Sequence, residues 1–178
     1  MGCHPPTVTT KRALRQQAES RRRARPVAQL DGVLTELLDG ASRVAAYLPV
    51  GSEPQLTVRP GWLLPVVTED GDLDWAPFDG ELVSRRGLRE PAGPLLGRAA
   101  VSSCDLVLVP ALLVATDGVR LGKGAGCYDR ALPRVTGLTV ALVADEELVE
   151  ALPSEPHDVR VGAVATPGRG VLRVPFKM

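Results

Sequence analysis

Apolar residues recur along the chain in two different periods. Between residues 30 and 38 they are three or four positions apart, as on one face of a helix, and Gly40 follows as a stop. These residues are Leu30, Val33, Leu34, Leu37 and Leu38. The spacing predicts a helix that packs on a core.

A helix is also expected over residues 11–19, capped by Thr9 or Thr10 and ending at Pro26 at the latest. Lys11 and Arg15 are four positions apart and therefore share one face of it. From composition alone, such a basic helix is usually a solvated surface.

Continuous or alternating apolar runs elsewhere predict strands. The runs are residues 43–48, 62–67, 73–78, 105–109, 138–144 and 159–164. The turn at residues 69–72 predicts a hairpin between the second and third runs. We expect an extended loop over residues 87–97, a helix from residue 128 to 135 and a short helix over residues 145–152.

Strands that alternate with helices predict an α/β fold with a mostly parallel sheet. Ligands bind such sheets beyond the carboxyl ends of the strands. The loops after Leu48 and Val109 and the loop that contains His157 are therefore expected to meet at one site.

Composition narrows the class of protein. The chain has 178 residues, 44% of them hydrophobic, which predicts a single domain over residues 1–178 with a disordered tail at residues 1–8. The formal net charge is zero, so neither nucleic acid nor an anionic membrane is an expected partner. Three cysteines without a C-x-x-C spacing, and no run long enough to span a bilayer, favour the cytoplasm. We expect a monomer.

Residues 120–130 carry the most chemistry. Gly122, Gly124 and Gly126 let the backbone turn tightly before a helix, where unpaired N–H groups favour an anion. Arg120 and Lys123 add positive charge, while Asp129 suits phosphate only if a cation such as Mg²⁺ lies between. The spacing matches neither a P-loop nor the Rossmann fingerprint, and on glycines alone an ordinary flexible turn is an equal alternative.

The same residues resemble the R-L-G-x-G-x-G-x-Y-D-R signature of the 5-formyltetrahydrofolate cyclo-ligase family. Other blocks follow in the family's order, so that the resemblance covers residues 11 to about 166. They are Lys11-x-x-Leu14-Arg15, Tyr47-Leu48 with Glu53, Gly87-Leu88-Arg89-Glu90-Pro91, and Leu152-Pro153-x-Glu155-x-His157-Asp158. The resemblance implies a three-layer, Rossmann-like sandwich with helices on both faces of the sheet, similar to the NagB/RpiA/CoA-transferase-like architecture.

The resemblance also implies a reaction, the ATP-dependent closure of 5-formyltetrahydrofolate into 5,10-methenyltetrahydrofolate. By the same resemblance, the formyl oxygen attacks the γ-phosphate, and N10 of the folate then displaces phosphate. Phosphoryl transfer requires mainly alignment and charge neutralisation. Arg120 and Lys123 are therefore the expected catalytic residues.

The resemblance assigns the remaining roles residue by residue. The expected ATP contacts are Lys11, Arg15, Arg120, Leu121, Gly122, Lys123, Gly124, Ala125, Gly126, Cys127 and Tyr128. The expected folate contacts are Leu48, Glu53, Lys123, Gly124, Ala125, Gly126 and Cys127. Asp129 and Asp158 are the expected ligands of Mg²⁺.

Cys127 stands where the family usually has an aromatic residue, so Tyr47 or Trp75 would have to supply ring stacking on the folate. Two other classes remain open. One is a relative that binds nucleotide or folate without cyclising it, and the other is a sugar-phosphate enzyme of similar architecture.

Overall fold

The computed structural model describes residues 10–178, so the predicted tail at residues 1–8 lies outside the described part. A seven-stranded sheet forms the centre, in the order β12-β11-β9-β6-β1-β2-β3. Its strands are β1 (Val44–Ala45), β2 (Leu63–Val67), β3 (Leu73–Pro77), β6 (Leu106–Pro110), β9 (Leu138–Leu142), β11 (Ala163–Thr166) and β12 (Gly170–Arg173). All neighbours pair in parallel except the edge strands β3 and β12, which are antiparallel to β2 and β11. The predicted mostly parallel α/β sheet is confirmed.

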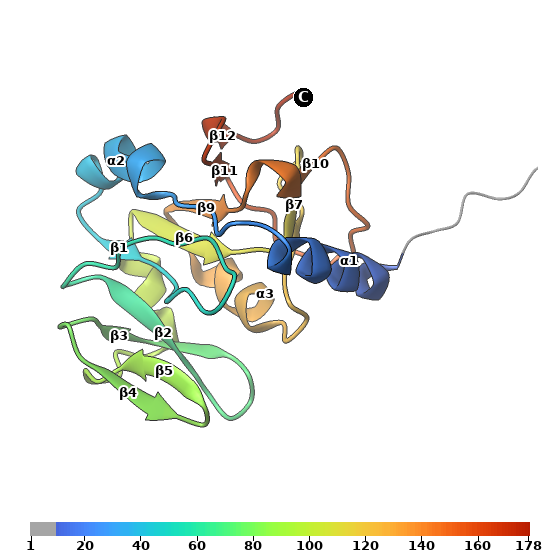
Figure 1. Ribbon diagram of the computed structural model, residues 1–178. Coiled ribbons are helices and arrows are strands. Elements are labelled where there is room, and N and C mark those ends of the chain that lie inside the picture. The colour runs from blue at the N-terminus through green and yellow to red at the C-terminus, as the bar shows by residue number, and fades with distance from the viewer. Residues whose placement is uncertain (1–9) are drawn as a thin grey trace, which may run out of the picture.

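Helices cover both faces of this sheet because its central strands are buried on both sides. Along β6, Leu106 and Leu108 point to one apolar cluster, while Val107 and Val109 point to another. Helix α2 (Asp31–Asp39) covers the first face, and α3 (Cys127–Ala131), with the 3₁₀ turns η1 (Arg98–Ser103) and η2 (Leu132–Arg134), covers the second. Figure 1 shows α2 and α3 on opposite sides of the sheet.

A smaller sheet stands beside the central one, in the order β10-β7-β8. Its strands are β7 (Leu113–Ala115), β8 (Arg120–Leu121) and β10 (Leu148–Val149). Helix α1 (Lys11–Arg23), capped by the Thr10 side chain, packs on this sheet through Leu14 and Ala18. The predicted first helix is thus confirmed, and the apolar run of residues 106–115 contains two strands of different sheets.

The predicted loop over residues 87–97 is wrong at its start. Strand β5 (Leu88–Pro91) pairs with β4 (Leu82–Arg85) in a two-stranded sheet. Arg86 and Gly87 join them with φ of 50° and 78°, as the right-handed twist of a tight hairpin requires. An Arg-Gly pair is a weak turn signal, so the hairpin was missed.

The predicted helix over residues 145–152 is also wrong. The chain makes one 3₁₀ turn, η3 (Asp145–Glu147), and then enters β10. Tertiary contacts decide this, because Asp145 accepts hydrogen bonds from Thr166 and Gly168 while Leu148 is buried. The last predicted strand begins at Ala163, four residues late, because Val161 donates its N–H to Gly118 instead of to a neighbouring strand.

Among residues 10–178, no helix is both long and apolar enough to cross a membrane.

Candidate active site

One cavity of about 410 Å³ lies where the end of β6 and the loop after β1 meet α1 and the small sheet. This volume is within the usual range for a small-molecule site. Every residue of the expected ATP, folate and Mg²⁺ contacts lies on its wall. These residues are Lys11, Arg15, Leu48, Glu53, Asp158 and the stretch 120–129. Segments more than 100 residues apart in sequence are therefore gathered around one space.

The glycine turn forms one wall of the cavity. Strand β8 delivers Arg120 and Leu121, and after the turn the chain enters α3 with Gly126 as its cap at φ 71°. A side chain at Gly122 would meet the Arg120 guanidinium at 2.7 Å, so glycine lets the arginine lie against the turn. Arg15 reaches the same turn from α1 and donates Nε–H to the Gly122 carbonyl at 3.0 Å. The turn is thus held between two arginines.

Each cation expected to bind phosphate is paired with a carboxylate, except Arg15. The Lys11 ammonium lies 2.7 Å from both Glu155 and Asp158, Arg120 lies 2.7 Å from Asp129, and Lys123 lies 2.6 Å from Glu53. Arg120 is buried, while Lys123 is 52% exposed. The cavity wall therefore carries a high density of charge of both signs, most of it in ion pairs.

These pairs shift the pKa of several groups. Burial opposes the shift, but hydrogen bonds to Asp158 and Glu155 hold the pKa of Lys11 above its ordinary value. Burial likewise opposes the fall in the pKa of Asp158, which its bond to Lys11 lowers. Burial raises the pKa of Tyr128, whose hydroxyl has no hydrogen-bond partner among the described residues. Lys11 is therefore cationic and Asp158 anionic at neutral pH.

The two expected metal ligands lie on the same cavity but have different partners. Asp129 is bonded to Arg120, whereas Asp158 belongs to a group with Glu155 and His157 whose donor atoms lie within 4.8 Å of one another. Carboxylate oxygens are the donors that Mg²⁺ prefers. The donor set at this wall fits a hard cation, and the Lys11 ammonium already lies between two of its carboxylates.

Only one of the two aromatic residues considered for stacking reaches the cavity. Tyr47 lines it and donates its hydroxyl to the Pro54 carbonyl at 2.6 Å. Trp75 is 1% exposed in the core and is not part of the wall, so the expectation that it could stack on a ligand is wrong. Cys127 lines the cavity and packs on the apolar cluster beneath α3.

Several wall residues had no predicted role. Arg22 is buried at the end of α1, where it pairs with Glu147 at 2.6 Å and donates to the Ala111 carbonyl. Glu90 from β5 is also buried and accepts the Val67 N–H. The block around Glu90 was recognised in the sequence, but Arg22 could not be told from the basic residues beside it.

An α/β fold with a glycine turn, clustered cations and carboxylates around one cavity is typical of proteins that bind phosphorylated small molecules. Comparison with known proteins makes this specific. The model of the 5-formyltetrahydrofolate cyclo-ligase family matches residues 8–167, and the chain belongs to that family.

Individual relatives agree with this assignment. The chain is 41% identical over 160 residues to a 5-formyltetrahydrofolate cyclo-ligase of Mycolicibacterium smegmatis, covering 80% of this chain and 82% of the relative. It is 31% identical over 100 residues to the Escherichia coli enzyme, covering 54% and 55% of the two chains. The solved 5,10-methenyltetrahydrofolate synthetase of Aquifex aeolicus is similar in structure, with a TM-score of 0.74, 25% identity and 94% of each chain covered.

Proposed function

We propose that the protein catalyses the ATP-dependent cyclisation of 5-formyltetrahydrofolate to 5,10-methenyltetrahydrofolate, with release of ADP and phosphate. The observation that carries the proposal is that one cavity collects, from distant parts of the chain, every residue that matches the family's ligand contacts. We further propose that the protein acts in the cytoplasm, as one domain and as a monomer.

Two bond exchanges make up the reaction. The formyl oxygen attacks the γ-phosphorus of ATP, and the bond between that phosphorus and ADP breaks. N10 then attacks the formyl carbon, the bond from carbon to phosphate breaks, and N10 loses its proton. Both steps depend on alignment of the reactants and on compensation of moving negative charge.

The basic side chains of the wall suit the first step. Arg120 is buried and lies against the glycine turn, so it would meet the triphosphate with little loss of side-chain freedom even after Asp129 turns to the metal. Lys11 and Arg15 approach from α1. Lys123 is bonded to Glu53, and a pterin that donates to Glu53 would release the lysine towards the reacting phosphate.

Asp129 and Asp158, which line the same cavity, would hold Mg²⁺. When bound, Mg²⁺ would compensate the charge of the phosphate oxygens. In that state the two aspartates would exchange Arg120 and Lys11 for the metal, which would leave both cations available to phosphate.

Turnover is tested by incubating the protein with 5-formyltetrahydrofolate and MgATP while the near-ultraviolet absorbance of methenyltetrahydrofolate is recorded. Product that depends on ATP supports the ligase. Folate binding without product would support a non-cyclising relative, and the absence of both would favour a sugar-phosphate enzyme.

The metal role has its own variant. Asp129→Ala should abolish turnover, whereas Asp117→Ala, which removes an exposed aspartate paired with Arg160, should leave it unchanged. Unchanged turnover of Asp129→Ala at limiting Mg²⁺ would refute the metal role of Asp129.

A further inference from the structure

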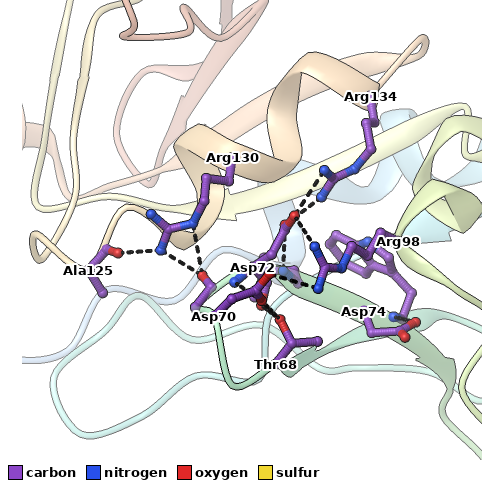
Figure 2. A network of polar contacts seen from close by, with 11 residues as sticks. Thr68, Asp70, Asp72, Asp74, Arg98, Ala125, Arg130 and Arg134 are labelled. Atoms are coloured by element: carbon purple, nitrogen blue, oxygen red, sulfur yellow. Dashed lines mark hydrogen bonds and ion pairs between the residues drawn. The ribbon is translucent and has the colours of Figure 1, made fainter.

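Arg130, the last residue of the glycine signature, has no ligand role and does not belong to the cavity wall. Its guanidinium bridges two carbonyl groups that are far apart in sequence. It donates to Gly71 from Nε at 3.2 Å and from Nη2 at 2.7 Å, and Nη2 also donates to Ala125 at 2.8 Å. Figure 2 shows Arg130 between the glycine turn and the β2–β3 hairpin turn.

The hairpin turn is a fixed point. Asp72 is buried and accepts from Arg134 at 2.5 and 3.1 Å and from Arg98 at 3.3 Å, as Figure 2 shows. Two backbone hydrogen bonds also close the turn. The Thr68 N–H donates to the Asp72 carbonyl and the Gly71 N–H donates to the Thr68 carbonyl, both at 3.0 Å. The position of the Gly71 carbonyl is therefore set by η1, which carries Arg98, and by η2, which carries Arg134.

The Ala125 carbonyl, in contrast, belongs to the exposed half of the glycine turn. In a trans peptide, C=O and the following N–H point in opposite directions. A bond from Arg130 to the Ala125 carbonyl therefore turns the Gly126 N–H away from the guanidinium. The guanidinium also lies against the turn, because a side chain at Gly126 would meet Arg130 Nη1 at 3.1 Å.

We propose that Arg130 is a positioning residue that fixes the glycine turn for the triphosphate by fastening the Ala125 carbonyl to the hairpin turn of residues 68–72. This inference rests on the proposed function, since it assigns ATP to the glycine turn. Arg130 touches neither substrate. Its hydrogen bonds keep the glycine turn in one conformation before ATP binds.

The first test removes the bridge at Arg130. Hydrogen bonds from a charged donor are the stronger ones, so Arg130→Gln should raise KM for MgATP about tenfold. KM for 5-formyltetrahydrofolate and Tm should change little, because Arg130 is exposed. Arg130→Met removes the charge and every donor, so it should resemble Arg130→Gln, whereas Arg130→Lys keeps a charged nitrogen that can donate to both carbonyls, as Nη2 does, and should restore part of the loss. A methionine variant with the wild-type KM for MgATP would overturn the inference.

The second test displaces the guanidinium from the hairpin side. A side chain at Gly71 would meet Arg130 Nη2 at 2.6 Å, so Gly71→Ala should raise KM for MgATP as Arg130→Gln does. Gly170→Ala is the matched control, because Gly170 also lies in a hairpin, with φ 70° against 77° at Gly71, and has open space around it. Gly170→Ala introduces similar backbone strain but displaces no arginine, so KM for MgATP should not change.

The double variant tests whether Gly71 and Arg130 act through the same hydrogen bonds. In the Arg130→Gln background, Gly71→Ala should add no further rise in KM for MgATP, since the group that it displaces is gone. Additive effects would show that the two residues act separately and would overturn the inference. Calorimetric Kd values for MgATP provide the same comparison without turnover. Wild-type protein that turns over normally while the Arg130 variants bind MgATP unchanged would refute this inference and leave the proposed function intact.

Discussion

The protein uses the same chemistry, arginine or lysine against carboxylate, in two regions with opposite consequences. In the β2–β3 hairpin, Asp72 is surrounded by Arg98, Arg134 and the Leu73 N–H, and its bonds join elements of the fold. On the cavity wall, Lys123 pairs with Glu53 beside an open space of about 410 Å³. A carboxylate with partners on every side fixes structure, whereas a pair beside a cavity can exchange partners with a ligand.

The comparison predicts its largest effect at Lys123. If Lys123 has the proposed catalytic role, Lys123→Gln should lower kcat about 100-fold or more, because it removes positive charge from the site of the transition state. The free energy of unfolding should change by less than about 1 kcal/mol, since this lysine is half exposed. Turnover rates and urea unfolding of the same preparation measure both.

Arg160→Gln is the control for Lys123→Gln, because Arg160 is 55% exposed and pairs with Asp117 away from the cavity. It should alter neither quantity. Equal losses of turnover in the two variants would remove the distinction between the regions.

The reverse pattern is expected at Asp72. Asp72→Asn keeps the shape but removes the charge between Arg98 and Arg134, and should lower the free energy of unfolding by about 2 kcal/mol. Turnover per folded molecule should fall much less than in Lys123→Gln. The exposed Asp39→Asn, on α2, should leave the urea midpoint unchanged. An unchanged free energy of unfolding together with a large loss of turnover per folded molecule would contradict the structural role of Asp72.

The pH dependence of stability should differ between the regions. The hydrogen bond from Arg134 lowers the pKa of Asp72 below its ordinary value of 3.8. Its stabilisation is therefore complete above that value and is lost as pH falls through the lower folded pKa. The acid limb of the stability curve should be flatter in Asp72→Asn than in wild type, and Tm measured below pH 4 tests this.

Lys11 on the cavity wall should affect stability at alkaline pH. Its pKa lies above the ordinary 10.5, so its contribution is present below that value and is lost as pH rises through the folded pKa. Lys11→Gln should flatten the alkaline limb and, because the bond to Lys11 lowers the pKa of Asp158, also part of the acid limb. An alkaline limb identical to that of wild type would show that its pairs with Asp158 and Glu155 do not contribute.

The smallest effect is expected at Cys127. A ring at this position would face the cavity, and Cys127→Tyr should lower KM for 5-formyltetrahydrofolate about threefold through stacking. Cys104→Ser, in the core away from the cavity, should leave this KM unchanged. A higher KM in Cys127→Tyr would mean that Tyr47 already fills the role of the ring.

The sequence predicted what local patterns encode. The spacing of Leu34 and Leu38 predicted α2, the continuous run ending at Val109 predicted β6, and the signature at residues 120–130 predicted the glycine turn. Whether these residues bind ATP, folate and metal as assigned stays a prediction.

The rest depended on partners distant in sequence. Arg22 becomes a buried residue only because Glu147 and the Ala111 carbonyl meet it, 125 and 89 positions further along the chain. The sequence predicted that Glu147 belongs to a helix of residues 145–152. Its carboxylate instead accepts hydrogen bonds from the Ala144 N–H and from Arg22. Arg130 had no visible role because its acceptor, the Gly71 carbonyl, is a backbone group 59 positions away. Backbone acceptors leave no signal in a sequence.

The position of α1 has a consequence for how the molecule matures. This helix is the first element of the described chain, yet its apolar partners are Leu112, Leu113 and Leu121, and its ion pairs reach Glu147, Glu155 and Asp158. During synthesis from the amino end, α1 emerges long before any surface exists on which it can dock. Helix α1 can therefore dock only after most of the chain has been synthesised, so Lys11 and Arg15 should be among the last residues to reach the cavity wall.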